Sequence, residues 1–422
     1  MTQAGLEPRR RAVALMTQVT EEHLPLHTPH RLDEVLIGLP PEERARALRL
    51  ATEALRWANR SDRLLGPHLR MKPEDQVMNA LRLALYEINV TGAPSHAAVN
   101  AAVSIVKKSK AGLVNAVLRN VVRMEQDWDA LPPPQTAKWL RKRLIAAWKK
   151  EAVAAMEIAH SRPPALDLTV KSDAAAWAEK LGAELLPTGN LRLAEAGQVS
   201  AIEGYDDGAW WVQDAGATLP ALMLDAQPGE RVLDLCAAPG GKTMQLVATG
   251  ADVTALDISD NRVVRLRQNL ARVGMTAELV IADALEWTPE AAFDAILLDA
   301  PCTATGTLRR HPDLGYAKDG TELETLVPFQ SELIDRALGW LKPGGRLVYC
   351  TCSLLPEEGE AQLAAALKRH PDFTVGTFVP EGVDPAWVAP AGGLRLRPDY
   401  WAERGGIDGF FIALLQKPAC AE

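Results

Sequence analysis

The 422-residue sequence has no long apolar run and little cysteine. No stretch approaches the roughly 18 consecutive apolar residues that a membrane-spanning helix needs, so we expect no membrane association. The first residues, MTQAGLEPRRRAVAL, lack the uninterrupted apolar stretch of a secretory signal peptide. Low-complexity segments are also missing, which argues for folded domains. We therefore expect a cytoplasmic, ordered protein.

Cysteine is scarce, and its spacing argues against two common roles. The five cysteines include no CxxC pair: Cys236, Cys302, Cys350, Cys352 and Cys420. An odd number argues against a disulfide framework, and the missing pairs argue against a zinc site, so we expect reduced thiols and no bound metal. Four of them fall at predicted carboxyl ends of strands, where α/β enzymes keep their chemistry.

Charge is unevenly distributed, although the net charge of the whole chain is −8. Residues 1–150 contain 24 Lys and Arg against 15 Asp and Glu, a net of +9, which leaves −17 for the remainder. A basic N-terminal part on an acidic body is typical of proteins that bind nucleic acid through that part. A chance asymmetry of solvated helix faces explains the counts equally well.

The N-terminal region has helical periodicity. Between residues 9 and 123 apolar side chains recur three or four apart, as in Leu81, Leu85 and Ile88, which predicts an all-helical domain over 1–130. Prolines that open such runs are expected in first helical turns. They are Pro41, Pro73 and Pro94.

The predicted second region, 131–213, begins with the proline-rich break LPPPQ and a helix, KWLRKRLIAAWKKEAVAAMEIAH. That helix carries a basic cluster, defined as Lys138, Arg141, Lys142, Arg143, Lys149 and Lys150. Short β-like runs between 165 and 213, with one helical stretch, predict a small α+β subdomain.

Over 214–422 apolar strands alternate with helix-length segments, from RVLDL at 231 to GFFIALLQ at 409. This alternation predicts an α/β domain with a doubly wound, mostly parallel sheet of seven strands. Its ligands are expected beyond the carboxyl ends of the strands.

A glycine-bearing turn, DLCAAPGGKT, follows the first of these strands. It matches neither GxGxxG nor the GxxxxGK[ST] phosphate loop, which argues against phosphate cradling. The second strand is predicted to end in Asp257 and the third in Asp283, where carboxylates can accept hydrogen bonds from a ribose diol and an adenine amino group. The pattern favours a nucleoside cofactor without pyrophosphate. Each aspartate taken alone could equally cap a helix.

Two cysteine-bearing segments are predicted to open onto one cleft. The fourth strand runs into Asp299-Ala-Pro-Cys302 and the fifth into Cys350-Thr-Cys352. A thiolate that adds to carbon 6 of cytosine makes carbon 5 nucleophilic, and position favours Cys352, at the cleft mouth, for this role. Asp299 is placed to hydrogen-bond the base. For any lone cysteine an inert buried thiol is the commoner reading.

These motifs resemble a known family. DLCAAPGGKT, LLDAPCTATGTLRRHPD and LVYCTCSLLPEEGE are similar to the RsmB (Sun/Fmu) group of RNA 5-methylcytosine methyltransferases, and LALYEINVTGAPSHAAVNAAVSIVKK resembles the NusB fold. The resemblance implies a Rossmann-like domain that uses S-adenosylmethionine (SAM), with Cys352 as nucleophile, Cys302 assisting product release, and a cytosine of small-subunit (16S) ribosomal RNA as substrate. The implied SAM-binding residues are Cys236, Ala237, Ala238, Pro239, Gly240, Gly241, Lys242, Asp257, Asp283 and Asp299.

Three alternatives remain open at this point. The chain could be an RNA-binding adaptor whose methyltransferase domain is catalytically inactive, although intact Cys302 and Cys352 argue against this. It could methylate an exocyclic amine, although DAPC stands where amine methylases carry [DN]PP[YF]. It could also modify transfer RNA or large-subunit RNA by the same chemistry.

Overall fold

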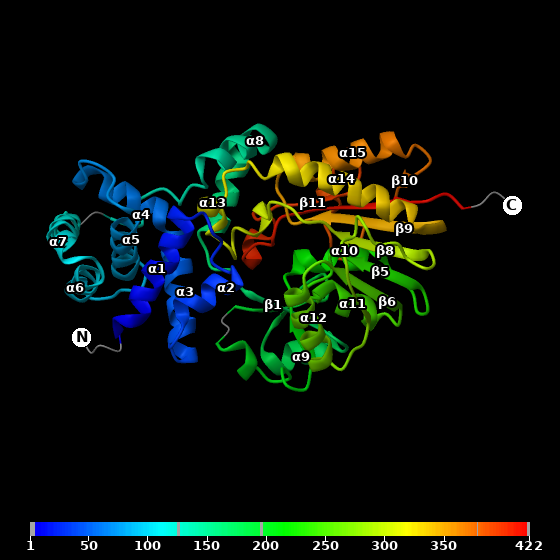
Figure 1. The fold of residues 1–422 in the computed structure, drawn as a ribbon, viewed down its shortest axis with the longest axis horizontal. Coiled ribbons are helices and arrows are strands. Elements are labelled where there is room, and N and C mark those ends of the chain that lie inside the picture. Colours follow the sequence, from blue (N-terminus) through cyan, green and yellow to red (C-terminus); the bar gives the residue numbers. More distant parts are fainter. Residues whose placement is uncertain (1–4, 125–126, 195–196, 378, 420–422) are drawn as a thin grey trace. The chain divides into compact units, whose positions relative to one another are not determined.

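The computed structural model describes residues 5–124, 127–194, 197–377 and 379–419 (Figure 1). The chain groups into two units. They are a helical unit, Met1–Pro163 with Leu308–Gly320, and a sheet unit, Pro164–Thr307 with Thr321–Glu422. The predicted middle region, 131–213, is divided between them, and the predicted domain boundaries stay a prediction.

The helical unit has the predicted all-helical character. Its elements are α1 (Glu7–Glu21), α2 (Pro29–Leu36), α3 (Pro41–Arg56), α4 (Ala58–Leu65), η2 (Gly66–His68), α5 (Asp75–Asn89), α6 (Ser95–Ile105), α7 (Lys108–Arg123), α8 (Lys138–His160) and α13 (Leu314–Ala317). Helix α5 is central to its core, where Leu81 and Leu85 are buried as the periodicity predicts.

The prediction for the three prolines was right only for Pro41, which is the first residue of α3. Pro73 lies before α5, and Pro94 is the residue before the first turn of α6, with an extended backbone (ψ 128°). Proline fixes φ but not ψ, so it can precede a helix as readily as begin one.

The basic helix α8 is not continuous, because Lys149 has non-helical backbone angles (φ 67°, ψ 162°). The prediction of one unbroken helix over 138–160 was therefore wrong at this residue. Within the basic cluster, Arg141 pairs with the buried Glu157 at 2.8 Å. Lys142 and Arg143 are exposed.

Leu308–Gly320 lies in the sequence between the two parts of the sheet unit but belongs to the helical unit. Its Asp313 is buried and accepts a hydrogen bond at 2.9 Å from the backbone N–H of Leu26. Ala317 is part of the helical core, and Tyr316 packs against it. This excursion begins six residues after Cys302.

The sheet unit begins with the predicted small α+β part. Its described elements are β1 (Leu166–Val170), α9 (Ala174–Leu181), β2 (Glu184–Leu185), β3 (Leu191–Leu193), η3 (Val199–Ala201) and β4 (Trp210–Val212). The strands pair antiparallel in the order β2-β3-β1-β4. Arg192 of β3 makes a bidentate ion pair at 2.7 Å with the fully buried Asp167 of β1.

The large sheet follows, with strands and helices in alternation. Its elements are α10 (Ala215–Leu224), β5 (Arg231–Leu235), α11 (Gly241–Ala248), β6 (Asp252–Asp257), α12 (Asp260–Arg272), β7 (Glu278–Ile281), β8 (Phe293–Asp299), η4 (Thr305–Thr307), α14 (Leu323–Gly339), β9 (Leu341–Thr351), η5 (Pro356–Glu358), α15 (Glu360–Arg369), β10 (Thr374–Val375), η6 (Pro385–Trp387), β11 (Leu394–Leu396), η7 (Ala402–Arg404) and β12 (Phe410–Gln416).

Among the described residues this sheet has eight strands, in the order β10-β12-β9-β8-β5-β6-β7 with β11 also paired to β12. The predicted doubly wound sheet is confirmed, but the prediction of seven strands was wrong. Strands β9, β8, β5, β6 and β7 are mutually parallel, whereas the pairings of β12 are antiparallel. No helix among the described residues is long and apolar enough to cross a bilayer.

Helices cover both faces of this sheet (Figure 1). Alternate side chains of a strand face opposite sides, so Val232 packs with α10 and α11 whereas Leu233 packs with α14 and α15. Strand β9 repeats the alternation with Leu347 and Val348. Both faces of the parallel strands are therefore buried, and the carboxyl edge is left for chemistry.

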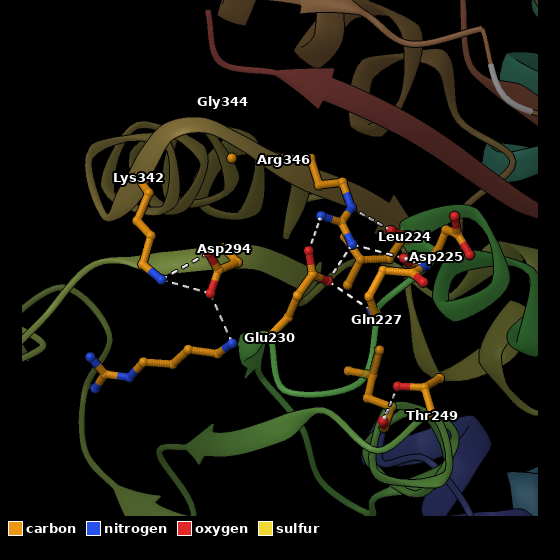
Figure 2. Close-up of polar contacts among 12 residues, drawn as sticks. Leu224, Asp225, Gln227, Glu230, Thr249, Asp294, Lys342, Gly344 and Arg346 are labelled. Carbon is orange, nitrogen blue, oxygen red and sulfur yellow. Dashed lines mark hydrogen bonds and ion pairs between the residues drawn. The ribbon is translucent and has the colours of Figure 1, made fainter. Parts of the chain in front are cut away.

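Ion pairs link the elements at the other end of the sheet, near the amino ends of the parallel strands (Figure 2). Arg346 of β9 binds the carboxylate of Glu230, at 2.6 and 2.8 Å, and the carbonyl oxygens of Leu224 and Asp225. The hydrogen bonds from Arg346 hold the pKa of Glu230 below its usual value. This cluster ties the end of α10 to β5 and β9.

Candidate active site

The predicted cofactor turn leaves β5 at Leu235 and enters α11 at Gly241. Cys236 has a positive φ of 66° and Gly240 one of 104°. A Cβ at Gly240 would lie 2.3 Å from Cδ1 of Leu266, so the Leu266 side chain would have to shift, and the positive φ would strain any other residue. Glycine at this position therefore allows the turn to pack directly against α12, next to the end of β6.

The predicted carboxylates lie around this turn. Asp257 is the last residue of β6 and is buried, and its two oxygens accept the backbone N–H groups of Ala238 (3.1 Å) and Ser259 (3.0 Å). Strand β7 ends at Ile281, so the prediction that it ends in Asp283 was wrong by two residues. Asp283 accepts the N–H of Leu285 at 2.9 Å.

These donors and acceptors fit a nucleoside cofactor. Each carboxylate oxygen has two lone pairs, so the backbone contacts of Asp257 and Asp283 leave acceptor capacity for ligand hydroxyl and amino groups. Beneath the turn, buried Asp234 accepts the hydroxyl of Thr243 at 2.6 Å, while its Oδ1 has no partner among the described residues. Burial raises the pKa of Asp234 to about 7.

Lys242 joins the cofactor turn to the end of β8. Its ammonium binds Oδ2 of Asp299 at 2.8 Å. Burial alone would lower the pKa of Lys242, but the negative groups around it, with Asp299 foremost, together outweigh burial and raise that pKa. Lys242 therefore remains a cation and anchors the Asp299 carboxylate, whose side chain is about a third exposed.

The structure brings the two predicted catalytic thiols together. The Sγ atoms of Cys302 and Cys352 are 3.4 Å apart, within hydrogen-bonding distance for sulfur. The hydrogen bond with Cys352 and burial both raise the pKa of Cys302. The loops are also joined through the backbone, because Gly306 donates its N–H to the carbonyl oxygen of Cys352 at 2.9 Å.

The other cysteines have different surroundings. Strand β9 ends at Thr351, between Cys350 and Cys352. Cys350 is fully buried and donates to Oδ1 of Asp299 at 3.5 Å, and burial raises its pKa. Burial also raises the pKa of Cys236. Cys420 lies outside the described residues.

A functional candidate that sequence reasoning missed is Glu358, in the LLPEEGE segment. Its buried carboxylate accepts hydrogen bonds from Thr303 and from Ser353, the residues that directly follow the two thiols. The only sequence signal was an acidic pair shortly after Cys352, which on its own reads as solvent-exposed.

Two family models match the chain. One, described as 16S rRNA methyltransferase RsmB/F, covers residues 221–416, and the other, the NusB family, covers residues 6–123. A solved methyltransferase homolog protein from Pyrococcus horikoshii is 28% identical, with a TM-score of 0.56 over 71% of this chain and 98% of that one. The fold and the site therefore define a SAM-dependent methyltransferase.

Full-length relatives narrow the class further. The ribosomal RNA small subunit methyltransferase B of Pseudomonas syringae pv. tomato is 35% identical over 99% of this chain and 98% of its own length. The protein of the same name from Cronobacter sakazakii is 39% identical over 80% of this chain and 81% of its own length. The chain belongs to the ribosomal RNA small subunit methyltransferase B family.

Proposed function

We propose that this methyltransferase modifies carbon 5 of a cytosine in small-subunit ribosomal RNA through a transient bond between Cys352 and carbon 6 of the base. The observation that carries the proposal is the pair of thiols, 3.4 Å apart, in the loops that follow β8 and β9. An exocyclic amine is already nucleophilic and needs no thiol, so a paired-thiol site favours a ring carbon. The names of the relatives supply the RNA class.

The turn and the strand ends would hold the cofactor. We assign this role to Cys236, Ala237, Ala238, Pro239, Gly240, Gly241, Lys242, Asp257, Asp283 and Asp299. When bound there, SAM supplies an electrophilic methyl group on a positively charged sulfur. Asp257 and Asp283 would accept hydrogen bonds from the nucleoside part.

Cys352 starts the reaction as a thiolate. Its sulfur bonds to carbon 6 of cytosine, and the displaced electron pair makes carbon 5 nucleophilic. The Cys302 thiol, 3.4 Å away, stabilises that thiolate as a hydrogen-bond donor. Asp299 would accept a hydrogen bond from the cytosine amino group and so orient the base in the adduct.

Cys302 completes the reaction after carbon 5 has been methylated. Once the sulfur of Cys352 is bonded to carbon, it is no longer a thiolate, and the largest cause of the raised pKa of Cys302 is removed. Cys302 then loses its proton to solvent and, as a thiolate, takes the proton from carbon 5. The bond between carbon 6 and Cys352 breaks, and Cys352 leaves as a thiolate. Both sulfurs are then back in their starting states.

The helical unit would bind RNA through electrostatic attraction to its phosphates. Residues 1–150 carry a net charge of +9, and most of the basic cluster on α8 is exposed. Basic side chains of this kind bind phosphates without reading sequence. A ribosomal RNA substrate agrees with the cytoplasmic location expected from the sequence.

Two cysteine variants test the mechanism. Cys352→Ala should abolish turnover while leaving SAM affinity nearly unchanged, and methylation by this variant would overturn the nucleophile assignment. Cys302→Ala should instead accumulate a covalent enzyme–RNA adduct, because addition proceeds and elimination stalls. A denaturing gel without a slow-migrating species would contradict that role.

The substrate is tested by transfer of labelled methyl groups from SAM to deproteinised small-subunit RNA from cells that lack this protein, with transfer RNA and large-subunit RNA in parallel. Nucleoside analysis of the digested product should find the label in 5-methylcytosine of small-subunit RNA only. Label in another RNA would keep the chemistry and discard the target. Label in an exocyclic amine would discard the chemistry.

A further inference from the structure

Glu358 is a buried acid outside the predicted catalytic set. It ends η5, six residues after Cys352, and its side chain has no solvent exposure. Oε1 accepts the backbone N–H of Thr303 at 2.9 Å and Nε2 of Gln330 at 3.0 Å. Oε2 accepts the hydroxyls of Thr303 and Ser353, both at 2.5 Å. In each of these four hydrogen bonds the carboxylate of Glu358 is the acceptor.

These contacts join the two loops that carry the thiols. Thr303 follows Cys302 and Ser353 follows Cys352, so a single carboxylate binds the immediate neighbours of both sulfurs. Charged hydrogen bonds to a buried carboxylate are among the stronger ones in proteins. The link resists separation of the loops because any movement of Thr303 away from Ser353 breaks such a bond in a site that water does not reach.

Other hydrogen bonds support the same junction. The Thr305 hydroxyl lies 3.2 Å from that of Ser353 and accepts the N–H of Leu354 at 3.0 Å. Gln330, on α14, anchors the carboxylate to the body of the unit and also donates to the carbonyl oxygen of Pro301 at 2.8 Å. Glu358 therefore stands at the centre of a network that reaches both sides of the thiol pair.

We propose that Glu358 is a positioning residue that holds the Cys302 thiol against Cys352 and thereby controls the elimination step, an inference that rests on the proposed function. Addition forms a bond to one sulfur only, that of Cys352, and Cys302 assists it merely as a hydrogen-bond donor. Elimination requires both, with Cys302 placed at the proton of carbon 5 while Cys352 remains bonded to carbon 6. A displacement of the Cys302 loop relative to the Cys352 loop therefore slows elimination more than addition.

Glu358→Ala tests this role, with Glu358→Gln as the matched control. A glutamine can keep the four contacts, because its oxygen accepts from Thr303 and Gln330 while the two hydroxyls rotate to accept from its amide. A misplacement of about 1 Å costs about 100-fold in rate. We expect Glu358→Ala to lose about 100-fold in kcat, to accumulate the covalent RNA adduct and to keep SAM affinity within about 2-fold. Glu358→Gln should recover most of the rate.

Cys302→Ala is run on the same gel to separate this inference from the proposed function. If Cys302→Ala traps an adduct and folded Glu358→Ala turns over like the wild type, the positioning role is refuted. The role is also refuted if Glu358→Ala loses SAM affinity as steeply as kcat. If Cys302→Ala traps no adduct and Cys352→Ala still methylates, the proposed function itself has failed.

A second variant covers the case in which Glu358→Ala does not fold, since that change leaves buried donors unpaired. Thr303→Val removes one hydroxyl link and retains the carboxylate. Adduct accumulation by Thr303→Val, with unchanged thermal stabilisation by SAM, supports the positioning role. Wild-type turnover by Thr303→Val refutes it.

Discussion

Substitution of Gly306 tests whether methyl transfer depends on the close backbone packing of the loop that carries Cys302. The N–H of Gly306 donates to the carbonyl oxygen of Cys352, and its own carbonyl accepts the N–H of Gly409 at 2.8 Å. A Cβ at Gly306 would lie 1.9 Å from the carbonyl oxygen of Gly409, whereas real Cβ atoms stay beyond 3.0 Å. Gly306→Ala must therefore move one of two backbone segments by about 1 Å. A shift of that size in a reacting group costs about 100-fold in rate.

The assay is single-turnover methyl transfer with saturating SAM and RNA, together with SAM affinity by titration. We expect a loss of about 100-fold in the transfer rate, a SAM affinity close to that of the wild type and a destabilisation of about 1–3 kcal/mol from overpacking. Gly339→Ala is the control, because a Cβ at this exposed residue of α14 meets nothing within 4 Å. Wild-type transfer by Gly306→Ala would refute the reasoning that this contact sets the position of the loop.

Three further predictions concern stability and RNA affinity. Asp167→Ala leaves the buried Arg192 guanidinium without its carboxylate and should lower the free energy of unfolding by about 3–5 kcal/mol, measured by denaturant titration. Glu230→Gln should lower the melting temperature at pH 7. Arg346 depresses the pKa of Glu230, so the ionised carboxylate stabilises the fold above the unfolded-state pKa. This stabilisation is lost as the pH falls through the lower folded-state pKa. The difference in melting temperature between Glu230→Gln and the wild type should therefore shrink on acidification. A gap that does not shrink as the pH falls below the unfolded-state pKa would contradict this assignment. Neutralising exposed basic residues within 138–150 should reduce the salt dependence of RNA binding without changing the modified nucleotide, and a shifted site would contradict a purely electrostatic role.

Local pattern was sufficient to predict the α/β sheet and most of its functional edge. Asp257 and Asp299 are the last residues of β6 and β8, as predicted, because apolar strands and polar turns alternate clearly along this part of the chain. The strand count was wrong because β10 and β11 have only two and three residues. Strands that short carry no readable alternation.

Features that depend on distant contacts could not be predicted. Glu358 lies 55 residues from Thr303, and nothing in its neighbourhood signals that it is buried. The break in α8 falls at Lys149, in a run without glycine or proline, so the usual marker of an interrupted helix is missing. The thiol pair was expected at one cleft, whereas its spacing of 3.4 Å is a property of the tertiary fold.

The excursion Leu308–Gly320 has a consequence for how the chain can be divided. A fragment that stops at residue 163 would lack Ala317 and Tyr316, which complete the helical core, and would leave the buried N–H of Leu26 without its carboxylate. A fragment that starts at residue 164 would carry the same segment with no core to enter. The two units are therefore interleaved along the sequence rather than joined end to end, and a cut at residue 163 would separate this thirteen-residue segment from the core into which it packs.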